Sequence, residues 1–599
     1  MTLVVPVAPA PGIAARPLWV ALGALTIAAH LGLILYGLVP NLVARPLHMA
    51  LILPWVFALP AATAGARARG WALAGAGIAA CLWIAWNHAA LRDQYGFLEG
   101  PGQIALAAFL LLLALEGARR MIGWPLPLVA AATLAYGLLG QHIPGSFGHS
   151  GTPLASFLGT LTIAEGGLWG SLTGVSVGVV AVFVIFGAVL NAGEAGAGFM
   201  NLAAAAAGRL KGGAAKVSVL SSALFGSISG SASANVASTG AVTLPTMTRL
   251  GYPRRLAGAV EAVASSGGQI MPPLMGAGAF VMVELTGVPY TGIMAAAFLP
   301  AILYFWAVWV GIDGYAARFA LRGLAPEERP ARRDVIVTSG FFLIPFTILL
   351  TMMFAAGFTP QYAAVAAIAA GFGLLAFDAE GPALPRLPAR LAEACVTAGR
   401  QVAMIAAIIL CASIVIGVLG ITGLGVKLTS AILAGGGGTL WGALILTALA
   451  CLLLGMEVPT TAAYVICVSV AGPALIELGL APLQAHLFVF WFALLSTITP
   501  PVCGAVFIAA GMVGENWLRV ALTAMALGLG LYLIPLGMIA NPQVIGLAAR
   551  PGAALLAFAV MALGLALVSR AVVGRGHPAL RLVLGGAGLA LLLGQSALA

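Results

Sequence analysis

Charged residues are scarce in this sequence. Only 7% of its 599 residues are Asp, Glu, Lys or Arg, against about 25% in a soluble globular domain. Hydrophobic residues make up 62% of the chain, and the mean hydropathy is +1.09. So few charges cannot cover a surface that faces water. We therefore expect an integral membrane protein whose surface faces lipid, and we set aside the water-soluble classes.

The patterns of metal centres, disulfide frameworks and nucleic-acid surfaces are also missing. The six cysteines form no CxxC pair, and the seven histidines are dispersed without an HExxH motif. The formal net charge is +10, but the basic residues stand singly between apolar runs. We interpret them as topology determinants in short loops. No cofactor and no nucleic-acid partner is predicted.

Apolar stretches recur along the chain. A helix needs about 20 apolar residues to cross the bilayer, which predicts an all-α polytopic fold with about fifteen transmembrane helices. The first follows Arg16 without a small-residue cleavage site and is interpreted as an uncleaved span. The expected crossings are 19–39, 47–66, 71–90, 103–118, 124–141, 172–192, 256–285, 293–315, 335–357, 361–377, 401–420, 486–513, 517–538, 553–570 and 579–597.

Two further apolar stretches, 217–250 and 437–482, do not fit simple crossings. With the N-terminus in the cytoplasm, Lys216 and Arg249 place both flanks of the first stretch on the cytoplasmic side. Two full crossings would need about 40 apolar residues plus a turn, and the stretch is too short for that. We therefore predict a re-entrant helical hairpin here, and a second one at 437–482 that opens from the outside.

The two irregular regions overlay when Pro245 is placed on Pro473, a shift of 228 residues (473 − 245). The segment 269–276 (QIMPPLMG) then falls on 497–504 (TITPPVCG), and the tip 229–233 falls on 457–461. Paired Pro-Pro and Gly at one offset indicate a duplication. Because the two hairpins open to opposite sides, the prediction is an inverted-topology repeat, which is characteristic of secondary transporters.

The repeat divides the chain into six expected segments. They are N-terminal scaffold spans (1–142), a periplasmic connection (143–171), the first repeat (172–315), linking spans and cytoplasmic loops (316–400), the second repeat (401–540) and extra C-terminal spans (541–599).

Each repeat carries a polar tip followed by a helix interrupted at Pro-Pro-x-x-Gly. Proline removes a backbone donor and glycine loosens the helix, so freed carbonyls can bind a dehydrated cation. The half-helix N-termini at the breaks suit a substrate carboxylate. The predicted ion- and substrate-binding residues of the first repeat are Ser229, Gly230, Ser231, Ser233, Asn235, Thr239, Gly267, Gly268, Pro272 and Pro273. Those of the second repeat are Glu457, Pro459, Thr460, Thr461, Thr499, Pro500 and Pro501, with Thr497 as a further oxygen.

Acids inside a membrane are rare and usually functional. Glu457, at the second tip, has two possible roles. It binds a cation or a proton, or it is a water-facing acid on a flexible tip. We expect Glu261 to be a structural partner in the helix bundle, and Glu284 to lie at the interface.

Long motifs surround these breaks. They are 145–151 (GSFGHSG), 208–216 (GRLKGGAAK), 222–236 (SALFGSISGSASANV), 251–253 (GYP), 258–262 (GAVEA), 267–273 (GGQIMPP) and 459–464 (PTTAAY). Through them, residues 145–545 resemble the fused permease subunits of TRAP transporters, specifically the TAXI branch.

The resemblance implies a transport cycle. The first five spans would be a scaffold like the small membrane subunit, fused here to a large subunit that moves as an elevator. A periplasmic TAXI-type binding protein would deliver a small organic acid, and symport would carry it across the bacterial inner membrane. The coupling ion would be Na⁺, with Ser231, Asn235, Thr460 and Thr499 as its ligands. One departure makes H⁺ an alternative: 455–461 reads GMEVPTT, with an acid where the TAXI pattern has glycine.

Other functions fit less well. A dicarboxylate or citrate carrier without a binding protein shares the inverted hairpins, but the fused N-terminal spans argue against it. An intramembrane enzyme would need a catalytic constellation, and the sequence shows neither paired Asp in adjacent spans nor a His-based metal set. A channel fits poorly with two occluding hairpins.

Overall fold

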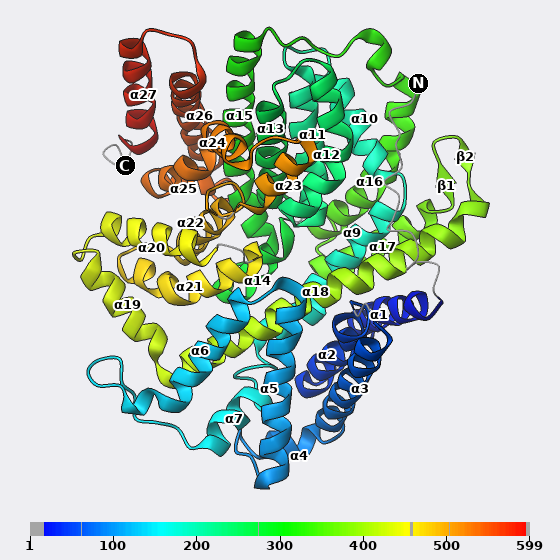
Figure 1. Ribbon diagram of the computed structural model, residues 1–599, viewed down its shortest axis with the longest axis vertical. Coiled ribbons are helices and arrows are strands. Elements are labelled where there is room, and N and C mark those ends of the chain that lie inside the picture. The colour runs from blue at the N-terminus through cyan, green and yellow to red at the C-terminus, as the bar shows by residue number, and fades with distance from the viewer. Residues whose placement is uncertain (1–16, 61–62, 274, 456–458, 502, 595–599) are drawn as a thin grey trace.

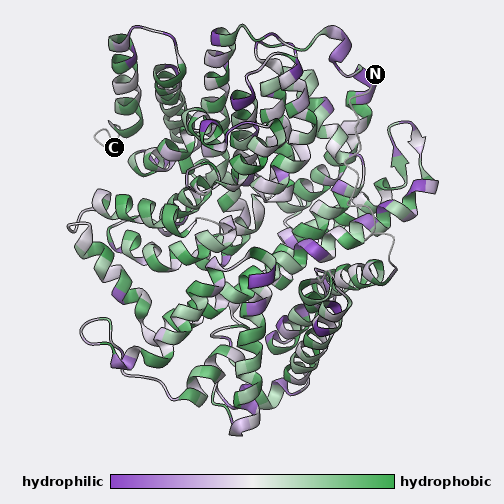
Figure 2. Ribbon diagram, in the orientation of Figure 1, coloured by the Kyte–Doolittle hydropathy of each residue, from purple (hydrophilic) through white to green (hydrophobic). Residues whose placement is uncertain are grey.

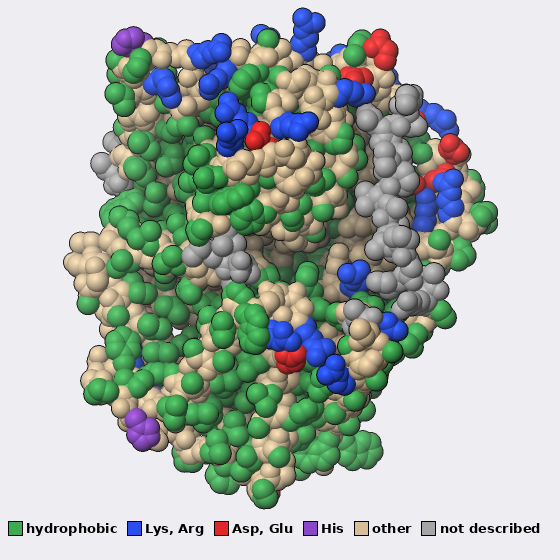
Figure 3. Space-filling model, viewed as in Figure 1, with side chains coloured by type: hydrophobic (Ala, Val, Ile, Leu, Met, Phe, Trp, Pro, Cys, Tyr) green, Lys and Arg blue, Asp and Glu red, His purple; other side chains and the backbone are tan. Residues whose placement is uncertain are grey.

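The computed structural model describes residues 17–60, 63–273, 275–455, 459–501 and 503–594. These residues are helical almost throughout, and their only strands are the short antiparallel pair β1 (Phe377–Asp378) and β2 (Gly381–Pro382). Green, hydrophobic positions dominate the ribbons of Figure 2. Figure 3 shows apolar side chains over most of the visible face, with Lys and Arg gathered mainly near its upper edge. This surface suits lipid, and it agrees with a multi-pass membrane protein.

The N-terminal part ends before residue 170. Its elements are α1 (Pro17–Tyr36), α2 (Asn41–Phe57), α3 (Ala64–Trp86), α4 (His88–Asp93), α5 (Gly100–Ile122), α6 (Pro125–Leu139), η1 (Gly140–His142) and α7 (Leu154–Thr162). Figure 1 shows α1–α7 together in the lower part of the molecule.

The region of the first repeat follows. Its elements are α8 (Ser171–Val175), the π-helical turn η2 (Ser176–Val180), α9 (Ala181–Ala192), α10 (Ala195–Ala207), α11 (Gly213–Ser229), α12 (Ala232–Arg249), α13 (Arg254–Gly267), η3 (Gly268–Ile270), α14 (Gly276–Thr286) and α15 (Tyr290–Phe319). The linking elements are η4 (Pro326–Glu328), α16 (Arg332–Phe354), α17 (Pro360–Leu374), the two strands, η5 (Leu384–Arg386) and α18 (Leu387–Thr422).

The last part of the chain is again helical. It comprises α19 (Leu424–Gly435), α20 (Leu440–Leu454), α21 (Thr460–Glu477), α22 (Pro482–Leu495), α23 (Gly504–Val513), α24 (Trp517–Leu527), α25 (Gly530–Ala540), η6 (Pro542–Ile545), α26 (Pro551–Val573) and α27 (Pro578–Leu593).

Ten spans among the described residues are long and apolar enough to cross a membrane, or eleven if the bent pair α19–α20 counts as one. The polytopic helical class is thereby confirmed, whereas the count of about fifteen is not. Two expected crossings, 256–285 and 486–513, are each split into shorter helices around a Pro-Pro pair. Four others are helices of 15 to 17 residues (α2, α6, α17 and α27).

The helices repeat at the offset found in the sequence. α12 and α21 begin 228 residues apart (460 − 232) and end 228 residues apart (477 − 249). α13 and α22 do the same (482 − 254 and 495 − 267). α11 packs on α12, and α20 packs on α21, so both irregular stretches are helix pairs. Their re-entry into the membrane and the division into six segments stay predictions.

The 36-residue helix α18 connects the parts of the fold. It contacts α1, α2, α5 and α6 on one side and α9 and α21 on the other. In Figure 1 it runs diagonally between the N-terminal helices and the body above them. It therefore forms a long wall along which the two repeats meet the N-terminal part.

Candidate functional site

The tip between α11 and α12 approaches the start of α14 backbone to backbone. Gly230 has φ +61°, and a Cβ there would lie 2.8 Å from the Cα of Gly276, which has φ +65°. Only a residue without a side chain adopts this conformation readily and permits this approach. Ser231 then caps α12, because its Oγ accepts a hydrogen bond from the N–H of Ala234 at 3.3 Å.

A second close approach holds the hairpin to α13. A Cβ on Gly268 would lie 2.6 Å from the Cα of Gly226. Next to it, the buried side chain of Asn235 donates hydrogen bonds to the carbonyls of Ser222 at 2.9 Å and Ser265 at 3.4 Å. The amide therefore clamps α11, α12 and α13 together just below the tip.

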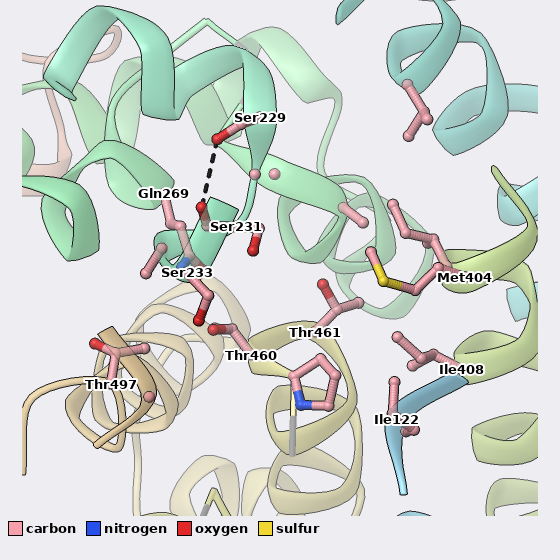
Figure 4. A pocket seen from close by; sticks show the side chains of 18 of the residues that line it. Ile122, Ser229, Ser231, Ser233, Gln269, Met404, Ile408, Thr460, Thr461 and Thr497 are labelled. Carbon is pink, nitrogen blue, oxygen red and sulfur yellow. Dashed lines mark hydrogen bonds between the residues drawn. The ribbon is translucent and has the colours of Figure 1, made fainter. Parts of the chain in front are cut away.

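A cavity of about 490 Å³ lies where the two helix pairs meet. Figure 4 shows the side chains of Ser229, Ser231 and Ser233 on one side, and those of Thr460 and Thr461 opposite them. Eight of the predicted residues line this cavity: Ser229, Gly230, Ser231, Ser233, Pro459, Thr460, Thr461 and Thr497. The two repeats thus bring their tips to one space.

The other predicted residues lie outside the lining. Pro273 and Thr499 lie at the interruptions before α14 and α23. The carbonyl of Pro273 accepts a hydrogen bond from the Tyr290 hydroxyl. The hydroxyls of Thr499 and Tyr532 are 2.6 Å apart. Glu457 is outside the described residues. The remaining predicted residues off the cavity wall are Asn235, Thr239, Gly267, Gly268, Pro272, Pro500 and Pro501.

The proposed Na⁺ ligands are divided in the same way. Ser231 and Thr460 face the cavity, whereas Asn235 and Thr499 do not. The Asn235 amide is already bonded to two carbonyls.

Sequence reasoning missed two polar side chains, those of Gln269 and Ser496, and most of the cavity wall. Gln269 lines the cavity, and it occupies the same repeat position as Thr497 (497 − 269 = 228), which also lines it. That offset could have identified Gln269. The apolar wall comes from helices far apart in the chain, so no local pattern marks it. It comprises Ile122, Val180, Phe183, Val184, Ile228, Ala232, Ala277, Phe280, Met404, Ile405, Ile408, Ala505 and Phe507.

The cavity suits an anion that also has an apolar part. None of the described lining residues is charged, and hydroxyl groups cluster at one side. α12 starts at Ala232 and α21 at Thr460, so both helix N-termini border the cavity. Their free N–H groups and partial positive charge favour an oxyanion. The rings of Phe183 and Phe280, stacked with centroids 4.4 Å apart, offer an apolar face.

Comparisons with known proteins agree on a transporter. Residues 109–553 match the family model described as "Tripartite ATP-independent periplasmic transporter, DctM component". The chain is similar to the C4-dicarboxylate TRAP transporter large permease protein DctM of Pseudomonas aeruginosa, with 26% identity over 339 residues, covering 55% of this chain and 76% of that protein.

Two further relatives share shorter regions. The isethionate TRAP transporter permease protein DctMQ of Oleidesulfovibrio alaskensis is 30% identical over 203 residues, which cover 30% of this chain and 32% of that protein. The uncharacterized protein y4mL of Sinorhizobium fredii is 30% identical over 191 residues, covering 31% of this chain. The chain thus spans less than half the length of these two relatives, 32% and 44% respectively.

Proposed function

Because the chain belongs to the family of the DctM component of tripartite ATP-independent periplasmic transporters, we propose that it imports a small organic acid by ion symport. The family makes it a multi-pass permease of the bacterial inner membrane and a secondary transporter rather than an enzyme. The observation that carries the proposal is the shared cavity, in which both tips and two helix N-termini meet without a charged lining residue among those described.

The substrate proposed for this cavity is an organic acid, carboxylate or sulfonate, with an apolar part. Its oxyanion would lie against the N-terminal turns of α12 and α21, among the hydroxyls of Ser233 and Thr460. Its hydrocarbon part would face Met404, across the cavity from Ser233, and the ring of Phe183, which also lines the cavity. The relative named for isethionate and the one named for C4-dicarboxylates offer the first two acids to try.

An elevator motion is part of the proposal. The cavity lies between the two helix pairs and a wall made by Ile122 of α5 and Met404 and Ile408 of α18. A domain that carries both tips could slide along such an apolar wall, because two apolar surfaces have no hydrogen bonds between them that a shift would break. In this proposal α1–α6 are the fused scaffold with a cytoplasmic N-terminus, and α1, α2, α5 and α6 pack on α18. A TAXI-type periplasmic binding protein delivers the substrate.

The symported ion has two candidate sites. Na⁺ would use the tip oxygens Ser231 and Thr460, with Asn235 and Thr499 behind them. H⁺ would use a buried carboxyl group, and Glu261 is the described acid that is fully enclosed.

The test is uptake of labelled succinate and isethionate into proteoliposomes that contain the purified chain. We expect uptake only when the cognate periplasmic binding protein and an inward ion gradient are both present. Ser233→Leu, which fills the cavity beside Thr460, should abolish it. Equal uptake without a binding protein would instead support a carrier of the dicarboxylate or citrate type. If no combination of binding protein and ion gradient produced uptake of either acid, the proposal would be contradicted.

A further inference from the structure

Glu261 lies at the centre of a cage of hydroxyl groups. Its carboxyl group, on α13, is completely buried. The Oγ of Ser218 donates to it at 2.8 Å, that of Ser265 at 3.3 Å and that of Ser222 at 3.4 Å. The hydroxyls of Thr239 and Thr243 on α12 donate to its two oxygens as well. Five hydroxyls from α11, α12 and α13 therefore surround one acid.

No positive charge balances this acid among the described residues. α11, α12, α15, α23, α24 and η3 pack against α13. Arg254 and Arg255 of α13 and Arg318 of α15 are exposed, Tyr315 of α15 stacks on Phe319, and the Tyr290 hydroxyl donates to the Pro273 carbonyl. The other ionisable side chains of these elements bond elsewhere, and α23 and η3 carry none. The pairings are Lys216 with Asp313, Arg249 with Glu328, Arg519 with Glu515, and the Tyr304 hydroxyl with the Val263 carbonyl.

The cage can satisfy the carboxyl group in both protonation states. The Thr239 hydroxyl is also 2.8 Å from the carbonyl of Asn235, and the Thr243 hydroxyl is 3.1 Å from that of Thr239. When Glu261 is ionised, the hydroxyls point their hydrogens at it. When it is protonated, it donates to a hydroxyl oxygen, and that hydroxyl turns to its own helix carbonyl. A purely structural acid would need only one of these arrangements.

The cage is joined to the tip of the first hairpin. The Thr239 hydroxyl lies 3.0 Å from that of Ser222 and 3.4 Å from Oδ1 of Asn235. Asn235 is one helical turn from Ser231, the cap residue that lines the cavity. A proton on Glu261 therefore changes the hydrogen bonds of the turn that presents its N-terminus to the substrate.

We propose that Glu261 is the proton-binding site of this carrier, which makes H⁺ the symported ion. The inference rests on the proposed function. One proton binds to a carboxylate oxygen of Glu261 while the cavity is open to the periplasm, and the same proton leaves to the cytoplasm after the substrate. The O–H bond formed outside is broken inside, so the cycle is balanced with one proton carried by this group.

The test observes the proton directly and needs no substrate. Infrared difference spectra are recorded on the full chain in lipid vesicles as the pH is changed, for wild type and for Glu261→Gln. Glu284→Gln is the matched control, because Glu284 lies exposed near the end of α14. We expect a band of a buried protonated carboxyl group that titrates in wild type and in Glu284→Gln, and that is lost in Glu261→Gln.

A second variant covers the case in which Glu261→Gln does not fold. Thr243→Val removes one donor to the ionised carboxylate and should shift the midpoint of the titration to higher pH. A wild type without a titrating band, a band that persists in Glu261→Gln, or an unmoved midpoint in Thr243→Val would overturn the proposal. A band that Na⁺ removes at constant pH would also overturn it. Loss of uptake alone, with the titration intact, would count against the proposed function only.

Discussion

Thr497 donates a hydrogen bond of 2.8 Å to the hydroxyl of Ser266, 231 residues earlier in the chain. Ser266 is buried on α13 of the first repeat, and Thr497 lies between α22 and α23 of the second, on the cavity wall. This bond links the two interrupted helices directly. It therefore offers a way to measure how strongly the two repeats depend on each other.

Removing this link should cost stability. We expect Thr497→Val and Ser266→Ala each to lower the free energy of unfolding by about 0.5–1.5 kcal/mol. The double variant should lose less than the sum, because both changes delete the same bond. Thermal unfolding in detergent measures this. Thr523→Val is the control, since its hydroxyl bonds only within its own helix. Strict additivity would contradict a direct link.

The close approach of Gly230 to Gly276 predicts that alanine at position 230 lowers the free energy of unfolding by more than backbone strain alone would. Gly230 and Gly287 both have positive φ, +61° and +68°, but only Gly230 has a neighbour within reach of a Cβ. Alanine at either position costs about 1–2 kcal/mol for the left-handed conformation. Gly230→Ala should cost measurably more in thermal unfolding, because its new methyl group meets Gly276. Equal losses would show that the tip can move aside.

A negative charge in the cavity should exclude an anion. Ser233→Asp places a carboxylate beside Thr460 and the N-terminus of α21, where it would occupy the place proposed for the substrate oxyanion. We expect uptake of labelled organic acids to fall by at least about tenfold, which corresponds to about 1.4 kcal/mol in binding. Ser430→Asp, on the exposed face of α19, should leave uptake unchanged. Similar uptake by both variants would contradict the proposed position of the substrate oxyanion beside Ser233.

A buried histidine pair joins the N-terminal helices to the cavity wall. Nε2 of His30 lies 2.7 Å from Nδ1 of His48, and Nε2 of His48 lies 2.9 Å from the hydroxyl of Ser176 in η2. His48→Leu leaves two buried polar groups unpaired, so we expect a loss of about 1–3 kcal/mol for each of them. His142→Leu, on the surface, should change stability by less than about 0.5 kcal/mol. Calorimetry compares the two, and equal stability would contradict a structural role for the pair.

The helix breaks were the most predictable part of the fold. Two prolines in a row cannot sit inside a regular helix, and a fixed offset between two such pairs leaves few alternatives. The ends of α12, α21, α13 and α22 repeat at that offset. Ser229, Gly230, Ser231 and Ser233, which the sequence analysis assigns to the binding site, line the cavity. Their binding of an ion or substrate stays a prediction.

The orientation of individual polar side chains was less predictable. Asn235 is only two residues from Ser233, yet it is buried among backbone carbonyls while Ser233 faces the cavity. A pattern of polar residues in the sequence does not indicate which neighbouring group each side chain will hydrogen-bond. Glu261 was expected to be a partner within the bundle, but its partners are hydroxyls spread over three helices. Their meeting depends on packing that no local motif records.

The matching ends of α12 and α21 limit which changes in chain length the two halves tolerate. One residue inserted within α12 or α13, or within α21 or α22, would turn the rest of that helix by about 100° about its axis. Side chains that face the cavity would then face a neighbouring helix or lipid. Side chains at equivalent positions differ, as those of Gln269 and Thr497 do, whereas the number of residues from tip to Pro-Pro pair is the same in both halves. The spacing is therefore the feature on which the geometry of the shared cavity depends most strictly.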